Sequence, residues 1–468
     1  MLKIYNTLTR TLDFFKPLKE GNVGIYSCGP TVYWNQHIGH MYAYVQWDVL
    51  VRFLRYKGYQ VKWVMNITDV GHMTSDEDTG DDKMEKGAKR EGISVWQIAD
   101  KYIKQFLKSV DLLNIQRPDV LCRATEHIKE QIDLIKKIET NGFTYKTKTG
   151  LVFDTSKFPH YADFARLNLS EQNAGERVEV DPEKKQPWDF LLWVTNQPNH
   201  IMQWDSPWGR GFPGWHIECT AMSVKYLGER FDIHTGGKEH VAVHHTNEIA
   251  QGFGAFGSRT ANYWLHNNWL TLKGEKISKS LGNMVLVTDI IEKGFDPLAL
   301  RYLILNSQYR TGMDFTWESL QSAQGGLENM RQMVRNLIAT KDKRESLSEE
   351  KLAKLDNSRK QFKDYLNDDL NIPGAMAIVW SMVKSNIPSG DKYDLLMHFD
   401  EVLGLKLDQI KIQKEEPTPK QVMELVRKRE QLRKAQKWEE ADGVRQEITA
   451  RGYNIKDLPG GSIINKKH

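Results

Sequence analysis

The chain has 468 residues, of which 40% are hydrophobic, 27% are charged and only 3 are cysteines. A chain of this length exceeds one hydrophobic core and indicates roughly three or four domains. Three cysteines exclude a disulfide framework and favour a reducing compartment, so we expect a cytoplasmic protein. No apolar run approaches the roughly 18–20 residues of a membrane span, and the N-terminus lacks a signal-peptide pattern.

The net charge of +4 is unevenly distributed along the chain. From Gln409 to the end there are 14 Lys and Arg against 9 Asp and Glu, so the positive excess lies in the tail. A basic tail suits a polyanion such as RNA, although on charge alone a solvated surface helix is the commoner explanation.

The N-terminal part alternates between strand and helix patterns. Val23–Cys28 is a strand pattern closed by a Gly-Pro turn signal, Met41–Lys57 is a helix pattern followed by Gly58, and Gln60–Met65 is the next strand pattern. This order predicts an α/β fold with a Rossmann-like parallel sheet and helices on its faces. Ligands of such sheets bind at the carboxyl ends of the strands.

The pattern changes several times further along the chain. After about residue 116 come a hairpin-like alternation at Gly142–Asp154 and a polar stretch, which indicate an insertion. The sequence after Pro297 has a helical pattern, and a polar linker that contains proline precedes the tail. We therefore expect a split Rossmann-like domain at residues 1–115 and 206–265, a connective insertion at 116–205, a linking segment at 266–318, a helical bundle at 319–408 and a small C-terminal domain at 421–468.

The tetrad His37-Ile38-Gly39-His40, here called the HIGH motif, follows the first strand and opens the Met41 helix. A helix N-terminus presents free backbone N–H groups and a partial positive charge, which suit a phosphate. Two histidines add donors for a polyphosphate, and Gly39 leaves room for a flat base against the backbone. Four residues alone are a weak signal, because histidines near a helix start are often only surface residues.

The run Lys276-Ile277-Ser278-Lys279-Ser280, here called the KISKS motif, lies far downstream between two glycines. Lysine is a flexible point charge that suits a phosphoryl group whose charge builds up during displacement. A solvated basic loop is the ordinary explanation of such a run. The pair of motifs on an α/β chain is more specific, and it resembles the pattern of class I aminoacyl-tRNA synthetases.

A third set of residues has the chemistry of a metal site. Cys28 ends the first strand, Cys219 lies far downstream, and His244 and Glu248 are four residues apart and so share a helix face. Two thiols, one imidazole and one carboxylate form a plausible four-ligand set for zinc.

The spacing leaves alternatives open at this set. His240 and His245 are rival ligands that spacing alone does not exclude. A single cysteine is more often a small buried hydrophobe than a ligand. Cys122, in the inserted region, is expected to be such an ordinary residue.

The chain as a whole resembles the cysteinyl-tRNA synthetase family, essentially from end to end. The resemblance rests on blocks spread over the chain: KIYNTLTR near the N-terminus, YSCGPTVY at Tyr26–Tyr33, the HIGH motif, NITD at Asn66–Asp69, PGWHIEC ending at Cys219, HHTNEIAQ from His244, KISKSLGN from Lys276, DDLNIP at Asp368–Pro373, and a tail pattern around Arg433 and Trp438.

The resemblance implies an ATP-dependent ligation of L-cysteine to tRNA(Cys) through a cysteinyl-adenylate, with one zinc ion per chain. Position matching assigns the zinc ligands to Cys28, Cys219, His244 and Glu248. Zinc binds a substrate thiolate and not a serine hydroxyl, so a site of this kind rejects the analogue by about 10⁴-fold or more. No editing domain is then needed, in agreement with the short insertion.

The resemblance also assigns roles to residues of the two motifs. ATP, with Mg²⁺, is expected at His37, Gly39 and His40, with Lys276 and Lys279 neutralising charge on the leaving pyrophosphate. The expected catalytic residues are therefore His37, His40, Lys276 and Lys279, and the expected substrate-binding residues are Cys28, Thr68 and Trp215. Trp215 is equally well explained as a core aromatic residue. The helical bundle and the tail are expected to contact tRNA, and the family leans towards monomers.

The sequence departs from the family pattern at several positions. Thr246 stands where a carboxylate is more usual, and Glu239 stands where an aspartate is expected. The acidic stretch Val70–Met84 is longer than expected and contains metal-ligand residue types, although a solvated loop is the favoured interpretation. The tail lacks a tryptophan that is often found near its end, which leaves the details of anticodon stacking open.

Three other functions share parts of this pattern. A cysteine ligase that acts on a small amino-sugar has both motifs and the zinc set, but lacks much of the C-terminal region that this chain keeps. A catalytically silent RNA-binding paralogue does not need intact His37, His40, Lys276 and Lys279. A synthetase for another amino acid has no use for the Cys28 set.

Overall fold

A computed structural model describes residues 1–71, 82–167, 182–277, 282–340, 346–411, 419–458 and 461–466. It divides the chain into two compact units, Met1–Ile410 and Lys411–His468. In the described ranges, every helix is too short or too polar to cross a bilayer. Lys279 and most of the acidic stretch Val70–Met84 lie outside the described residues.

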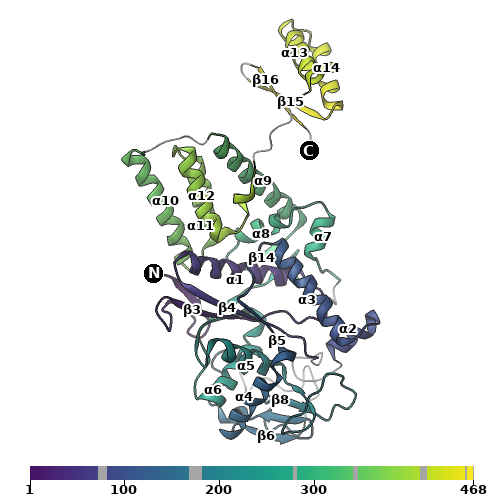
Figure 1. The fold of residues 1–468 in the computed structure, drawn as a ribbon, viewed down its shortest axis with the longest axis vertical. Helices are drawn as coiled ribbons and strands as arrows, with labels where there is room; N and C mark the ends of the chain where they lie inside the picture. Colours follow the sequence, from purple (N-terminus) through teal and green to yellow (C-terminus); the bar gives the residue numbers. More distant parts are fainter. Residues whose placement is uncertain are drawn as a thin grey trace. The chain divides into compact units, whose positions relative to one another are not determined.

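A five-stranded parallel sheet forms the centre of the first unit (Figure 1). The strand β10 is buried throughout and β4 is buried from Trp63 to Ile67, as expected for strands that are covered on both faces. The prediction of an α/β fold with a parallel sheet is confirmed. In spatial order the strands are β11 (Ala261–Asn267), β10 (Phe231–Gly237), β3 (Asn22–Ser27), β4 (Gln60–Ile67) and β5 (Val120–Arg123).

The strand β5 lies within residues 116–205, which the sequence pattern assigns to the insertion. It pairs with β4 from Val120 to Arg123 and so belongs to the central sheet. Its four residues follow Pro118 and Asp119 and are too few to show a periodicity. The central sheet therefore extends beyond the boundary expected at residue 115.

The direction of winding changes at β3. The helix α1 (Ile38–Tyr56) connects β3 to β4 on one side, whereas β10 pairs with β3 on the other side. The crevice outside the carboxyl ends of β3 and β10 is therefore the switch point at which open parallel sheets bind ligands. Cys28 and the HIGH motif follow β3 directly, so both start at this crevice.

An antiparallel sheet with the order β6-β7-β8-β9 forms the core of the inserted region. The predicted hairpin at Gly142–Asp154 is confirmed by the pairing of β6 with β7. In Figure 1 this sheet lies beside α4, α5 and α6, and their side chains share one hydrophobic core. The elements are α4 (Ile128–Thr140), β6 (Thr144–Thr147), β7 (Gly150–Phe153), β8 (Phe190–Thr195), β9 (Gly211–Pro213), α5 (Trp215–Leu227) and α6 (His244–Phe256).

The remaining elements of the first unit surround α1 and the central sheet. They comprise a hairpin at the N-terminus, two helices after the acidic stretch, a small three-stranded sheet and a helical region. They are β1 (Lys3–Asn6), β2 (Thr11–Phe14), α2 (Lys83–Glu91), α3 (Val95–Leu112), β12 (Leu270–Leu272), β13 (Glu275–Lys276), α7 (Val287–Glu292), α8 (Pro297–Leu305), β14 (Met313–Phe315), α9 (Trp317–Ala339), α10 (Glu349–Asn367), α11 (Ile372–Lys384) and α12 (Ser389–Leu403).

The second unit has two helices and a hairpin: α13 (Lys420–Lys434), α14 (Trp438–Ala450), β15 (Tyr453–Leu458) and β16 (Gly461–Lys466). Apolar residues at helical spacing, among them Val422, Val426, Val444 and Ile448, form its own small core. The basic excess of the tail therefore lies on a unit that has its own hydrophobic core.

A buried ionic network ties α1 to the helical region. Asp48 Oδ2 accepts hydrogen bonds from Arg301 on α8 at 2.6 Å and from Arg52 at 2.8 Å, while its Oδ1 accepts from the backbone N–H of Gln116 at 2.8 Å. Arg301 also donates to the Leu403 carbonyl at the end of α12. One carboxylate therefore pairs with two guanidinium groups and holds three segments together.

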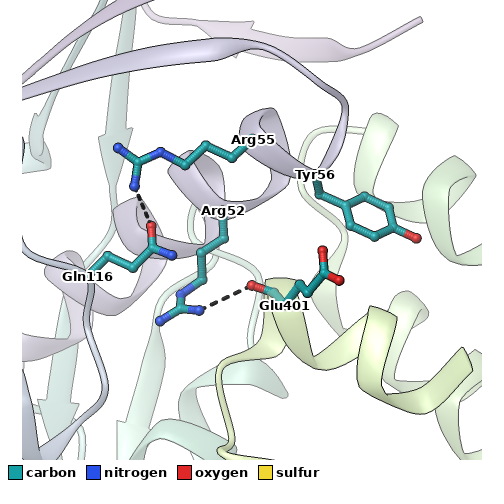
Figure 2. A pocket seen from close by; sticks show the side chains of 5 residues that line it. All are labelled: Arg52, Arg55, Tyr56, Gln116 and Glu401. Carbon is teal, nitrogen blue, oxygen red and sulfur yellow. Dashed lines mark hydrogen bonds between the residues drawn. The ribbon is translucent and has the colours of Figure 1, made fainter. Parts of the chain in front are cut away.

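A cavity of about 330 Å³ lies beside this network, between α1 and α12 (Figure 2). Both arginines that line the cavity donate hydrogen bonds to protein acceptors. Arg52 donates to the Glu401 carbonyl at 3.1 Å, and Arg55 donates to the Gln116 side chain at 2.6 Å. The hydrogen bond from Arg52 to Glu401 joins α1 to α12, so these residues have a structural role.

The substitution Asp48→Ala is expected to lower the free energy of unfolding of the first unit by about 3–5 kcal/mol, because it leaves buried Arg301 without its counter-ion. Urea unfolding followed by circular dichroism measures the change. The matched control is Asp364→Ala, which removes an exposed i,i+4 pair with Lys360 and should cost less than about 0.5 kcal/mol. Equal effects of the two substitutions would contradict this role of Asp48.

Candidate functional site

Cys28 is placed at the crevice by the end of β3. Its backbone N–H donates to the Thr235 carbonyl on β10 at 3.1 Å, so the cysteine extends the parallel pairing by one residue. Gly29 follows in close contact with Asn66, where a Cβ atom would come within 1.7 Å of the carbonyl oxygen. Only glycine fits at this position, and the tight passage fixes the direction of the Cys28 side chain.

Two helices bring the other donors to Cys28. Cys219 comes from α5, whereas His244 and Glu248 come from successive turns of α6. One donor atom of each of these residues lies within 4.8 Å of every other, and all four residues are buried. The four residues predicted as a metal set are therefore neighbours in space, and we call them the Cys28 cluster.

A second donor set overlaps the Cys28 cluster. His234 on β10 and His245 on α6 also lie within 4.8 Å of Cys28 and Glu248. Both ring nitrogens of His245 have partners, since Nδ1 lies 2.7 Å from His266 Nε2 and Nε2 lies 3.2 Å from Cys28 Sγ. His234 Nε2 lies 2.9 Å from Glu248 Oε2. These two histidines therefore hold the side chains of Cys28 and Glu248 in place.

The cluster fits a metal cation. Glu248 Oε1 is buried and makes no hydrogen bond to any described residue, although it lies 3.2 Å from His244 Nε2. Burial raises the pKa of the Cys28 thiol well above its ordinary value, and the neighbouring Cys219 and Glu248 raise it further. Two thiolates and a carboxylate can share this buried volume only if a cation neutralises them. Soft thiolates with one imidazole favour zinc over Mg²⁺ or Ca²⁺.

A chain of hydrogen bonds leads from the cluster towards the surface. Cys28 Sγ contacts His245, His245 contacts His266, and His266 Nδ1 lies 2.8 Å from the Thr7 hydroxyl. With the Thr7 hydroxyl as the donor, each histidine is neutral and the last N–H points at the sulfur. Such outer contacts orient a metal ligand and stabilise its thiolate form.

Thr68 and Trp215, the predicted substrate-pocket residues, lie on the same side of the sheet as the cluster. Thr68 donates to Glu218 Oε2 at 3.0 Å and accepts a hydrogen bond from Asn66 at 3.0 Å, so its hydroxyl is already engaged. The Trp215 ring centroid lies 5.3 Å from that of His244. Glu218 is fully buried, and the sequence does not predict this burial, because acidic residues on helices are usually exposed.

Thr246, which departs from the family pattern, does not point into the cluster. Its hydroxyl donates to the Val241 carbonyl at 2.7 Å. The hydrogen bond secures the entry of the chain into α6, where the backbone has no other side-chain cap. The departure therefore changes the start of the helix and leaves the four donors unaffected.

The HIGH motif caps α1. His37 is the N-cap residue, and its Nδ1 accepts the Gly39 N–H at 3.1 Å, while His40 Nδ1 accepts the His37 N–H at 3.2 Å. Burial lowers the pKa of His37 to about 4, with smaller effects from Glu239 and Lys276. A neutral ring that accepts at Nδ1 carries its proton at Nε2, so His37 presents an Nε2–H donor.

The KISKS motif begins beside the start of α1. Lys276 ends β13, and the buried Ile277 side chain lies 3.8 Å from the position that a Cβ of Gly39 would occupy. The Ile38 N–H donates to the Val285 carbonyl just after the motif at 2.8 Å. Residues almost 240 positions apart in the sequence are thus neighbours at the carboxyl end of the sheet.

Comparisons with known proteins agree with this geometry. A family model described as tRNA synthetases class I (C) catalytic domain matches residues 14–325. Proteins named Cysteine--tRNA ligase match over nearly the full length of both chains. The protein from Treponema denticola is 42% identical over 99% of each chain, and one from Thermus thermophilus is 40% identical over 98% of each.

The chain belongs to the cysteine–tRNA ligase family of class I aminoacyl-tRNA synthetases.

Membership of this family accounts for the whole chain. A relative from Burkholderia lata named Cysteine--tRNA ligase 1 is 44% identical and covers 98% of the chain, which includes most of the second unit. The amino-sugar ligase and the silent paralogue are therefore not favoured. A crystal structure of Mycobacterium tuberculosis methionyl-tRNA synthetase with methionyl-adenylate matches with a TM-score of 0.57 and 16% identity over 82% of this chain and 90% of that chain, which shows the shared fold.

Proposed function

We propose that the chain activates L-cysteine with ATP and transfers the cysteinyl group to tRNA(Cys), with a zinc ion in the Cys28 cluster that selects the substrate thiolate. The observation that carries the proposal is the position of the buried Cys28 cluster at the switch point, next to the capped start of α1. Family membership supports the overall reaction, and the donor chemistry supports zinc.

Selection of the amino acid follows from the donor set. When bound, zinc supplies a Lewis acid that takes the cysteine thiolate as a further ligand and has little affinity for the hydroxyl of serine. Around it, His234 and His245 keep the Glu248 and Cys28 side chains in fixed positions. A site that requires one specific bond rejects the analogue lacking that bond by about 10⁴-fold or more, so no editing step is needed.

Activation takes place at the start of α1. The cysteine carboxylate attacks the α-phosphate of ATP, one P–O bond breaks, and pyrophosphate leaves with its electron pair. The Nε2–H of His37 binds a phosphate oxygen, and the partial positive charge at the start of α1 attracts the anion. Since His37 is neutral, it acts as a hydrogen-bond donor and contributes no full positive charge.

Lysines neutralise the charge that develops on the leaving group. We assign this role to Lys276 and Lys279, of which Lys276 ends β13 beside the HIGH motif. No protein nucleophile is needed, so catalysis consists of positioning and electrostatic stabilisation. The 3′-terminal ribose hydroxyl of tRNA then attacks the cysteinyl carbonyl, and AMP leaves.

The helical region and the basic second unit are assigned to tRNA binding. The excess of Lys and Arg in the tail provides phosphate contacts, which give affinity but carry no sequence information. We further propose that the protein works in the cytoplasm as a monomer with ATP, Mg²⁺, cysteine and tRNA(Cys) as its partners.

Removal of one cluster ligand should remove the metal. Elemental analysis of the purified full chain should find about one zinc per chain, and Cys219→Ser or His244→Ala should lose most of it during dialysis. Cys122→Ser is the matched control, because Cys122 is equally buried but donates only to the Met65 carbonyl. Loss of zinc in a variant at His234 or His245, together with retention of zinc in His244→Ala, would show that the second donor set binds the metal.

The activity is tested by charging total tRNA with each of the standard amino acids. Only cysteine should become attached to tRNA, and Lys279→Ala should slow cysteine-dependent ATP–pyrophosphate exchange by about 10²-fold or more because one electrostatic contact to the leaving group is lost. Wild-type exchange rates in Lys279→Ala would contradict the role of this lysine, and the absence of cysteinyl-tRNA would overturn the proposed function.

A further inference from the structure

Two lysine side chains contact the indole of Trp269 at the edge of the proposed active site. Trp269 is 39% exposed, and the ammonium groups of Lys276 and Lys238 lie 5.3 Å and 5.2 Å from its ring centroid. Both distances are within the range in which an aromatic ring attracts a cation. One exposed indole therefore keeps two ammonium groups near the site, and an anion can draw on both charges.

Glu239 holds the indole in place. Its Oε2 accepts the Trp269 Nε1–H at 2.9 Å, and the carboxylate lies over Gly237, where a Cβ atom would come within 2.4 Å of Oε1. The glutamate at this position, one methylene longer than the aspartate expected there, thus connects the end of β10 with the indole. Lys238, Glu239 and Trp269 have no role in the activation step described above.

The backbone around the indole is rigid. Trp269 directly precedes β12, which pairs with β13 so that Thr271 lies opposite Lys276. The turn between these strands has positive φ at Lys273 and Gly274, as tight two-residue hairpins require. Asp314 Oδ1 accepts hydrogen bonds from the Thr271 hydroxyl and the Gly274 N–H, both at 2.7 Å. The hairpin therefore presents Lys276 in a fixed direction.

Two residues of this group, Glu239 and Lys276, lie within electrostatic reach of the start of α1. Glu239 and Lys276 both act on the pKa of His37, after the larger effect of burial. Ile277, the next residue after Lys276, packs against the HIGH motif at Gly39. An anion held at Lys276 is thus close to the His37 Nε2–H donor and to the positive end of the α1 dipole.

We propose that Lys238, held beside Lys276 on the Trp269 indole, is a further binding residue for the triphosphate of ATP. The inference rests on the proposed function and names a residue of its nucleotide site. Lys238 and Lys276 together carry two positive charges against one on Glu239, whose carboxylate is engaged by the indole. Trp269 positions both ammonium groups before the nucleotide arrives, and the triphosphate supplies the negative charge that they bind.

The test compares the full chain with Lys238→Met, which keeps the length of the side chain and removes its charge. The Kd for Mg²⁺-ATP, measured by calorimetry without cysteine, should rise about three- to tenfold, and the KM for ATP in pyrophosphate exchange should rise in parallel. The KM for cysteine should stay within about twofold. Added salt should weaken ATP binding more in the wild type than in the variant, because one screened contact is lost.

Two further variants separate charge from structure. Lys238→Arg should restore ATP binding, and Trp269→Phe should bind ATP more tightly than Trp269→Leu, because only phenylalanine keeps an aromatic face. The matched control is Lys293→Met, which removes a similar lysine 4.9 Å from the Trp317 ring centroid and should leave ATP binding unchanged.

An unchanged Kd for ATP in Lys238→Met, or an equal loss in Lys293→Met, would overturn the inference. The binding measurement needs no turnover, so it decides this point separately from the proposed reaction. A wild-type chain that binds ATP with the predicted dependence on Lys238 but shows no cysteine-dependent exchange would instead refute the proposed function.

Discussion

Three potentially anionic groups are buried together at the end of β3, and the architecture of the catalytic body is arranged around them. Cys28 follows β3, Cys219 lies on α5 and Glu248 lies on α6. The helices α5 and α6 precede and follow β10, which pairs with β3. Burial disfavours each charged form, so the set is stable in its ionised form only around a cation. The surrounding histidines then act as supports that fix the donors in one arrangement.

The same change of winding direction brings the Cys28 cluster close to the HIGH motif. Cys28 and the HIGH motif both follow β3, while the KISKS motif reaches α1 by way of the β12–β13 hairpin. In the proposed function, the amino acid is selected at the Cys28 cluster and its carboxylate is activated at the start of α1. Short and rigid connections suit this chemistry, because catalysis by positioning depends on the relative placement of the two substrates. The buried Asp48 network secures α1, which carries the phosphate-binding end, to the helical region.

Much of this arrangement could be predicted from the sequence, and the remainder could not for physical reasons. The strand and helix patterns around Cys28 and the HIGH motif predict the parallel sheet, because buried strands and a long apolar helix have clear periodicities. The spacing of His244 and His245 could not distinguish ligand from support, and the structure shows that both lie at the cluster with different partners. His234 and His266 were missed because a buried histidine within a strand carries no periodic signal. The short strand β5 was missed for the same reason, and Lys279 lies outside the described residues.

The most direct test of the account is X-ray absorption at the zinc edge, recorded on the full chain with and without substrate. In the free protein, zinc should have two sulfur neighbours at about 2.3 Å, with nitrogen and oxygen completing the shell. A third sulfur neighbour should appear when cysteine is added, and serine should cause no change. A protein that charges tRNA with cysteine without zinc, or a sulfur count that cysteine leaves unchanged, would contradict it.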